Sequence, residues 1–417
     1  MIDGPRALLL ALRNPNFSIY TVGNAVSLIG TWMHRLAAGW LTWELTHSGT
    51  WLGLIAFADL FPTVVITPFA GAAADRWDRV KVVQATLLLS FLPSLLLFVL
   101  VVTDTITIEL LLLSTLLLGA AAAFNVPARL ALIPSLVPRT ELNAAVAVNS
   151  VVFNLARFVG PWLAALLIAT AGVDYAFLAN ALSFVVFWAA MLRVDVASQK
   201  QAVAASAGMW REIAEGARYV VQHRGIAAIL VLLAATALGG RPLVELLPGF
   251  ASDVFQTDAS GLAAMTAAIG IGAMVGGLTL GVDSEPAPLM RRLIFATVCL
   301  ALASMVFTST RALWFALPLL VIAGFGHARI GIAAQTLIQL TTEESKRGRM
   351  LAIYGMLFRG GPAVGALIIG FASDYIGLPW ALFAGGVLMF SVWIWAFALR
   401  HRITRSFVSS PPDETSA

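Results

Sequence analysis

The sequence contains a single cysteine, Cys299, among 417 residues. One cysteine excludes an intramolecular disulfide bond and a metal cluster held by several thiolates. The phosphate-binding motif G-x-x-x-x-G-K-[ST], the zinc-binding motif H-E-x-x-H and the nucleophile motif G-x-S-x-G are also missing. We therefore expect no enzyme activity, no catalytic residue, no metal site and no cofactor.

Charged residues are scarce, and apolar runs take their place. Only 12% of the residues are charged, against roughly 25% in a soluble domain. Hydrophobic residues make up 59%, and the mean hydropathy is +0.88. The runs show no strand-like alternation, and a helix of about 20 apolar residues crosses the ~30 Å hydrocarbon core, so we predict an all-α membrane protein with twelve transmembrane helices. They lie near 17–43, 51–74, 82–103, 108–135, 143–170, 175–193, 225–249, 260–281, 293–309, 312–340, 350–371 and 379–400.

The basic residues are distributed unevenly between the loops. Of the 26 Lys and Arg residues, six lie within apolar runs and one, Arg311, lies in a loop that we assign to the outside. The remaining 19 lie at the two ends of the chain or in the even-numbered loops. Because Lys and Arg gather on the cytoplasmic side, we predict a multi-pass protein of the bacterial inner membrane with both termini cytoplasmic. This distribution accounts for the net charge of +4 without a nucleic-acid partner.

The two halves of the chain resemble each other at an offset of 210 residues. Gly30 aligns with Gly240, Trp40 with Phe250, and Asp75 with Glu285. Parallel repeats in a membrane transporter place the substrate path between the halves. We predict a cytoplasmic lead (1–16), a six-helix bundle (17–193), a cytoplasmic central loop (194–224), a second six-helix bundle (225–405) and a disordered tail (406–417). Within the central loop, residues 209–224 have helical spacing, typical either of a helix on the membrane surface or of a solvated linker.

The loop after the second run resembles the signature loop of the major facilitator superfamily, G-x-x-x-D-R-x-G-R-[RK]-x. The matching residues are Gly71, Asp75, Arg76, Arg79 and Lys81, whereas Asp78 stands where the pattern has its second glycine. The resemblance implies a gating role for this loop, with Asp75 facing the positive end of another helix. It also implies the fold of that superfamily, in which two six-helix bundles are related by a pseudo-twofold axis.

A Gly-Pro pair occurs in the fifth run and again in the eleventh. The first pair is Gly160-Pro161, and the second is Gly361-Pro362. Proline frees a backbone carbonyl and bends a helix, and the motif resembles that of superfamily antiporters, which export. The alternative is a packing kink without directional meaning.

Residues 127–161, with the first run, resemble the branch of the superfamily that contains the enterobactin exporter and the macrolide efflux proteins. This resemblance implies export of a small amphipathic, siderophore- or drug-like molecule by a monomer, driven by protons.

Charges inside the membrane are costly and mark candidate functional residues. We single out Arg35, Asp59, Arg157, Arg241, Glu245 and Arg359 as candidates for transport or coupling. Asp59 has no basic residue near it in sequence, so we expect either an unpaired proton site or an acid wetted by the outer vestibule. The 210-residue offset pairs Arg35 with Glu245, which predicts an ion pair across the central cavity. The alternative is that each residue pairs within its own half, for example Glu245 with Arg241.

These features together predict a proton-coupled exporter. Two alternatives remain open at this point: a lipid flippase on the same fold, and a membrane sensor or scaffold that transports nothing.

Overall fold

The computed structural model describes residues 10–195, 218–220, 223–279 and 285–408 of the chain. These residues form helices joined by short turns, and no strand occurs among them. In this described part, eleven helical segments are long and apolar enough to cross a membrane. The prediction of an all-α membrane protein is thereby confirmed, while the count of twelve spans stays a prediction.

The chain divides into two compact units. The first comprises residues 1–204 with 251–267, and the second comprises residues 205–250 with 268–417. The domain boundaries derived from the sequence stay predictions. Most of the central segment at 194–224 and of the tail at 406–417 lies outside the described residues.

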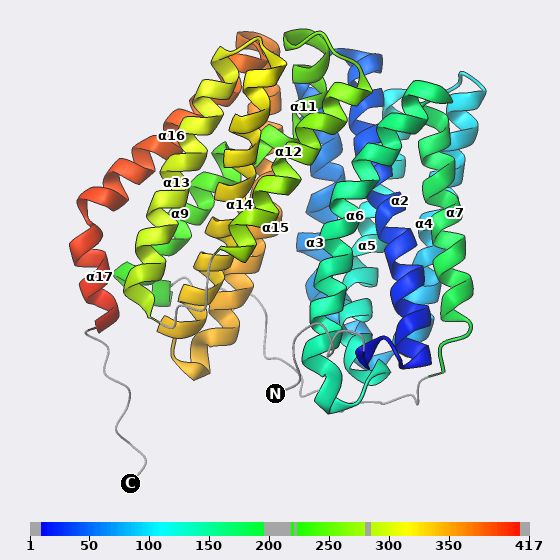
Figure 1. The fold of residues 1–417 in the computed structure, drawn as a ribbon, viewed down its shortest axis with the longest axis horizontal. Coiled ribbons are helices and arrows are strands. Elements are labelled where there is room, and N and C mark those ends of the chain that lie inside the picture. The colour runs from blue at the N-terminus through cyan, green and yellow to red at the C-terminus, as the bar shows by residue number, and fades with distance from the viewer. Residues whose placement is uncertain (1–9, 196–217, 221–222, 280–284, 409–417) are drawn as a thin grey trace. The chain divides into compact units, whose positions relative to one another are not determined.

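Six long helices build the main bundle of the first unit, and Figure 1 shows them side by side. A side-chain cap fixes where several of them begin: Asn14 accepts from the amides of Asn16 and Phe17, and Asp78 accepts from those of Val80 and Lys81. The helices are α2 (Pro15–Thr46), α3 (Gly49–Arg76), α4 (Arg79–Val102), α5 (Ile108–Leu136), α6 (Leu142–Thr170) and α7 (Val173–Met191), with a short 3₁₀ turn, η1 (Arg139–Glu141).

Two apolar clusters form the core of this bundle, one toward each end. One gathers Phe17, Tyr20 and Phe187 with side chains of α4, α5 and α6. The other is built around Leu97 and Phe177, with side chains of α2, α3 and α5. Because both clusters exclude water, polar groups between them must find partners within the protein.

A layer of polar side chains connects α2 with α5 and α4 with α7. Arg129 Nη1 donates to Asn24 Oδ1 at 2.7 Å, and Asn180 Nδ2 donates to Ser94 Oγ at 3.1 Å. Asn24 is only 1% exposed, so its amide depends on such bonds. Hydrogen bonds between membrane helices contribute roughly 0.6–2 kcal/mol each, and here they join two pairs of helices, α2 with α5 and α4 with α7. Buried polar groups also make α2 less apolar than its neighbours. Helix α2 is not among the eleven helical segments that are long and apolar enough to cross a membrane.

The second unit is built around α9, which packs against α14, α15 and α16. Its helices are α9 (Arg224–Gly239), α10 (Pro242–Glu245), α11 (Leu247–Gly249), α13 (Pro286–Ser309), α14 (Leu313–Thr341), α15 (Glu344–Ile376), α16 (Leu378–Ala398) and α17 (Arg400–Val408). The π-helical turn η2 (Phe250–Val254) and α12 (Ala259–Leu278) follow α11. The division between the units runs through α12, after Ala267.

The predicted run at 225–249 is not one continuous helix. The backbone leaves the helix after Gly239 and resumes at Pro242. Proline has no N–H group and its ring collides with the carbonyl four residues earlier, so a break before Pro242 is favoured. Arg241 lies in this interruption, where its backbone amide donates to Thr236 O at 3.0 Å. A broken helix inside the membrane is tolerated where it is buried in protein, and it is a feature of transporter binding sites.

Glycines let α12 and α14 approach each other closely within the second unit. A Cβ atom on Gly272 would collide with the carbonyl oxygen of Val321, and one on Gly324 would collide with that of Ile269. Gly277, five residues after Gly272 on α12, has ample room for a methyl group, with its nearest neighbour at 3.8 Å. Small residues at such contacts drive association where no hydrophobic effect operates between helices.

This packing predicts different outcomes for three Gly→Ala variants. Gly272→Ala and Gly324→Ala should each destabilise the protein by about 1–3 kcal/mol, because the backbone must shift to relieve the overlap. Gly277→Ala is the matched control and should melt like the wild type or slightly higher, since alanine favours a helix. Thermal melting of the purified protein measures the differences, and equal melting temperatures for all three variants would contradict the packing.

Candidate functional site

The first unit holds an ion pair inside its membrane-spanning helices. Nη2 of Arg35 on α2 lies 2.5 Å from Oδ2 of Asp59 on α3. The two side chains are 32% and 30% exposed, so the pair is partly shielded from water and each charge depends on the other. Helix α5 holds Asp59 in place, because a Cβ on Gly119 would come within 2.8 Å of the Asp59 carbonyl oxygen.

This contact corrects the prediction for Asp59. The absence of a nearby basic residue in sequence suggested an acid without an ionic partner, but α2 brings Arg35 to it from 24 positions earlier. Arg35 therefore pairs within its own unit, which is the arrangement left open as the alternative. The pairs of Glu245 with Arg35 and with Arg241 stay predictions.

His34 lies next to Arg35 in the chain and is buried, with 7% of its surface exposed. Its ring packs edge-on against Phe177, with the ring centroids 5.2 Å apart. Neither ring nitrogen has a hydrogen-bond partner among the described residues. Arg35 and Asp59 are both close enough to act on the ring electrostatically. The scattered spacing of the five histidines hid this residue in the sequence, although its place beside an intramembrane arginine was a usable signal.

Trp32, one helical turn before Arg35, has two guanidinium groups close to its ring. The Cζ atoms of Arg35 and Arg157 are each 5.4 Å from its ring centroid. Cations at this distance from an indole face are attracted by the ring quadrupole, by about 0.5–2 kcal/mol. Arg157 belongs to α6, so the tryptophan joins the arginines of two helices at one site.

The Gly-Pro motif brings α6 close to this site. A Cβ on Gly160 would lie 2.5 Å from Cβ of Trp32, so a larger residue would displace α6 from α2. Helices α6 and α15 continue through Pro161 and Pro362 without interruption, and the predicted bends stay predictions.

The second unit has a comparable group of side chains around Arg241. Its Cζ atom is 5.3 Å from the ring centroid of Phe358 on α15, and Phe358 stacks on Tyr354. The Tyr354 hydroxyl donates to Gly331 O at 3.0 Å, and both Arg241 and Arg359 act on it electrostatically.

Gly361 resembles Gly160 in its packing role. A Cβ there would lie 2.6 Å from Cβ of Ala237 on α9. Each unit therefore combines an arginine, an aromatic ring and a Gly-Pro helix in close contact with its neighbour.

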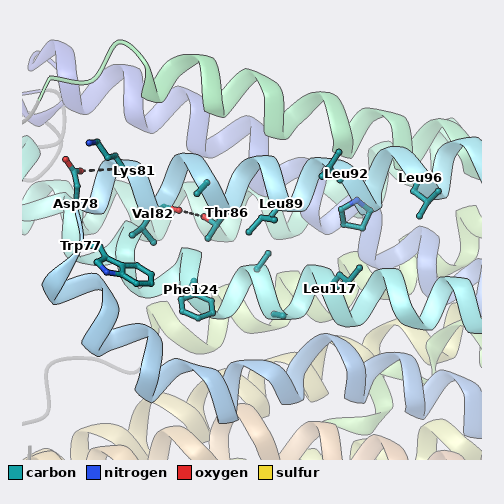
Figure 2. Close-up of a pocket in the computed structure, with 14 residues that line it drawn as sticks. Trp77, Asp78, Lys81, Val82, Thr86, Leu89, Leu92, Leu96, Leu117 and Phe124 are labelled. Atoms are coloured by element: carbon teal, nitrogen blue, oxygen red, sulfur yellow. Dashed lines mark hydrogen bonds between the residues drawn. The ribbon is translucent and has the colours of Figure 1, made fainter.

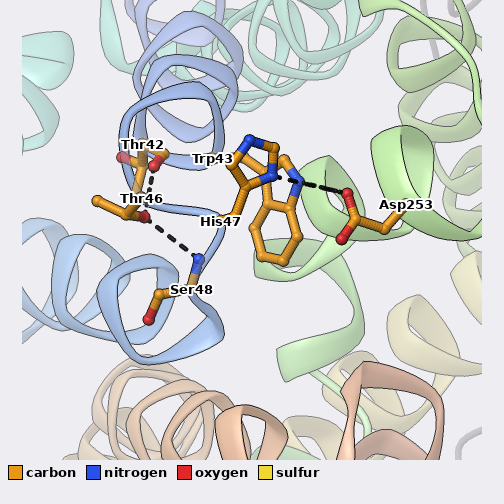
Figure 3. Close-up of polar contacts among 6 residues, drawn as sticks. All are labelled: Thr42, Trp43, Thr46, His47, Ser48 and Asp253. Carbon is orange, nitrogen blue, oxygen red and sulfur yellow. Dashed lines mark hydrogen bonds and ion pairs between the residues drawn. The ribbon is translucent and has the colours of Figure 1, made fainter.

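A second polar contact joins residues separated by 210 positions. Nε1 of Trp43 donates to Oδ1 of Asp253 at 2.9 Å, and Nδ1 of His47 lies 3.8 Å from the same oxygen (Figure 3). Asp253 lies in η2, within the segment that packs with the first unit. Trp43 and Asp253 are equivalent under the repeat offset, so the offset that suggested Arg35 with Glu245 could also have identified this contact. Sequence analysis missed it.

Part of the predicted gating loop can be placed. Arg79 Nη1 donates to Ala131 O on α5 at 3.0 Å, and the Lys81 side chain is exposed. Asp78, which departs from the family pattern, caps the first turn of α4. The side chains of Gly71, Asp75 and Arg76 lie outside the described part of the structure, so their gating role stays a prediction.

No group of three or more His, Cys, Asp and Glu side chains in the described ranges could hold a metal ion.

Comparison with known proteins agrees with this architecture. Residues 7–414 match the family of transmembrane secretion effectors. The staphyloferrin A transporter of Staphylococcus aureus is 25% identical over 358 residues, covering 84% of this chain and 87% of its own. The multidrug efflux pump Tap of Mycolicibacterium fortuitum is 27% identical over 390 residues, covering 90% of both chains. Macrolide efflux protein A of Streptococcus pyogenes is 22% identical over 387 residues, covering 90% and 94%.

Solved structures share the fold. A bacterial homologue of the human lysosomal transporter Spinster superposes with a TM-score of 0.69 at 15% identity and covers 100% of both chains. The nucleoside transporter NupG gives a TM-score of 0.66 at 13% identity, covering 95% of this chain and 100% of its own. The resemblance found in the sequence motifs is confirmed: this chain belongs to the transmembrane secretion effectors of the major facilitator superfamily and is a multi-pass membrane transporter, not an enzyme.

Proposed function

We propose that this transporter exports a small amphipathic molecule in exchange for protons. The observation that carries the proposal is the Arg35–Asp59 ion pair, with the buried ring of His34 beside it. Asp and His can gain and lose protons, whereas Arg keeps its charge at every physiological pH. The sequence contains no nucleotide-binding motif, so an ion gradient is the expected energy source.

Protonation of Asp59 is the proposed coupling step. A neutral Asp59 no longer compensates the charge of Arg35, so the attraction that holds the pair together is lost. Arg35 then favours a conformation in which another anion is available. We propose Glu245 as that anion, because the repeat offset makes it the equivalent of Arg35. Release of the proton on the other side of the membrane would restore the Arg35–Asp59 pair and reset the cycle.

His34 is proposed to serve the same step by holding a water molecule close to the Arg35–Asp59 pair. Its two ring nitrogens have no hydrogen-bond partner among the described residues, and an unsatisfied buried polar group is costly. The charged groups around it are Arg35 on its own helix and Asp59 on α3, while Phe177 of α7 presents an apolar face. A water molecule reaching this ring would therefore be stabilised there by hydrogen bonds.

The substrate class is inferred from Trp32 and its two arginines. Two guanidinium groups over one indole suit a molecule that combines an apolar body with a carboxylate or other hydrogen-bond acceptor. Relatives of the chain carry names that refer to staphyloferrin A and to macrolides. A siderophore-like or drug-like molecule is the substrate that fits these observations.

Transport by Asp59→Asn tests the coupling step. We expect the variant to retain exchange of labelled for unlabelled substrate but to lose at least tenfold in accumulation driven by a pH gradient, because the amide cannot take up the proton. The assay uses purified protein in liposomes, with a macrolide and staphyloferrin A as probes.

Asp104→Asn is the matched control. Asp104 is exposed in the turn between α4 and α5 with φ = 52°, a conformation that asparagine adopts readily. This variant should behave like the wild type. Gradient-driven accumulation that survives in Asp59→Asn would refute the role of Asp59, and equal loss of exchange and accumulation would mean that Asp59 is structural.

The orientation of the chain is also a proposal. The 19 Lys and Arg residues on one side support a cytoplasmic location for both termini. In a Cys299→Ala background, Thr140→Cys and Ser260→Cys introduce exposed thiols at turns that this orientation assigns to opposite sides. An impermeant maleimide added to intact cells should label Cys at 260 and leave Cys at 140 unlabelled. The reverse pattern, or labelling of both, would contradict the orientation.

A further inference from the structure

A groove of about 1140 Å³ lies between α4 and α5 in the first unit (Figure 2). Its walls include Leu89, Leu92 and Leu96 of α4 and Leu117 of α5, which are 58%, 61%, 47% and 50% exposed. Because this chain leaves half of each side chain uncovered, the groove opens toward the surrounding bilayer and away from the bundle interior. It is separate from the Arg35–Asp59 site, and none of the residues of that site lines it.

The walls of the groove favour an apolar occupant. Ala85 on α4 and Ala120 and Ala121 on α5 leave the space that larger side chains would fill. Thr86 also lines it, but its hydroxyl donates to Val82 O at 2.8 Å and accepts from Asn125 Nδ2 at 2.8 Å. Since that hydroxyl is already satisfied, a hydrocarbon chain can lie against it without loss of a hydrogen bond.

Charged and aromatic side chains are confined to one end of the groove. Trp77, Asp78 and Lys81 lie where α3 ends and α4 begins, whereas Leu92 and Leu96 lie at the opposite end (Figure 2). Trp77 is 62% exposed, and tryptophan favours the headgroup level of a membrane. Oδ1 of Asp78 accepts from the backbone amides that open α4, so the ammonium of Lys81 is the charge presented to a ligand.

The length of the groove matches one leaflet of a bilayer. Lys81 and Leu96 are fifteen residues apart on one helix, or about 22 Å at about 1.5 Å per residue. Half of a bilayer of about 40–45 Å, headgroups included, is about 20–22 Å. A molecule that is charged at one end and apolar over the thickness of a leaflet is a membrane lipid.

We propose that this groove is a specific glycerophospholipid site, with one acyl chain lying between α4 and α5 and the phosphate bound by Lys81. Trp77 packs beside the glycerol backbone at the mouth of the groove. The lipid belongs to the leaflet on the side where α3 ends, and its bound chain completes the surface that α4 and α5 leave open.

Native mass spectrometry of the purified full-length protein in mild detergent tests the site. The probes are phosphatidylglycerol and a diacylglycerol with the same acyl chains, which lacks the phosphate. We expect phosphatidylglycerol to bind and diacylglycerol to bind much more weakly. Lys81→Gln should weaken phosphatidylglycerol binding about fivefold, equivalent to about 1 kcal/mol for one basic residue at an anionic lipid. Ala85→Phe should abolish binding, because the ring occupies the groove.

Two matched controls keep the test specific. Arg139→Gln removes an exposed charge on the same side of the first unit, and Ala189→Phe places the same ring on an exposed position of α7. Both should bind phosphatidylglycerol like the wild type. If Ala85→Phe does not fold, Ala85→Cys in a Cys299→Ala background can be filled after folding with a bulky maleimide.

Three results would overturn the proposal: wild-type binding by Lys81→Gln, wild-type binding with the groove filled, or equal binding of diacylglycerol. A filled groove that excludes a macrolide but not the lipid would likewise refute it and would indicate a substrate site.

Discussion

The ion pair between Arg35 and Asp59 is the interaction on which the rest of the first unit's site depends. Placing two charges inside membrane-spanning helices costs several kcal/mol per ion unless each compensates the other. The pair is held from three sides: α2 carries Arg35, α3 carries Asp59, and the close approach of α5 at Gly119 fixes the Asp59 backbone. His34 and Trp32 are positioned by the same turns of α2. The polar groups of this site are therefore built on the contact between α2 and α3.

Each unit contains the same chemical combination in a different arrangement. In the first unit, the ring is that of Trp32 on α2, and the arginine is Arg157 on α6, beside the Gly-Pro motif. In the second unit, the arginine is Arg241, in the break before α10, and the ring is that of Phe358 on α15. Gly160 and Gly361 bring the Gly-Pro helices close to α2 and α9, respectively. Both units use a glycine of the Gly-Pro motif for a close helix contact, while the side chains that carry charge differ between the two copies. Pro242, which interrupts the second copy and aligns with Trp32 of the first, is the clearest sign of that divergence.

Sequence patterns predicted the class of the protein well, because helix length and apolar composition follow from the thickness of the bilayer. The loop at Gly71–Lys81 predicted the family. The arginines were predicted as functional candidates because a charge inside a membrane is energetically costly. Contacts between helices could not be predicted in the same way. The pairing of Arg35 with Asp59 depends on how α2 and α3 are rotated about their own axes. An apolar run without a clear polar face does not show which of its sides faces a neighbouring helix. His34 was missed because burial cannot be read from a single residue. The contact of Trp43 with Asp253 was within reach, since the repeat offset relates the two residues.

Infrared difference spectroscopy on acidification tests the central claim, that Asp59 takes up a proton under the control of Arg35, without knowledge of the substrate. The sample is the purified full-length protein in lipid. The account predicts that acidification produces a carbonyl band of a protonated, partly buried carboxyl group. This band should be absent in Asp59→Asn, retained in Asp104→Asn, and altered in Arg35→Gln, which removes the ionic partner of that carboxyl group. The same set of bands in the wild type and Asp59→Asn would contradict the account.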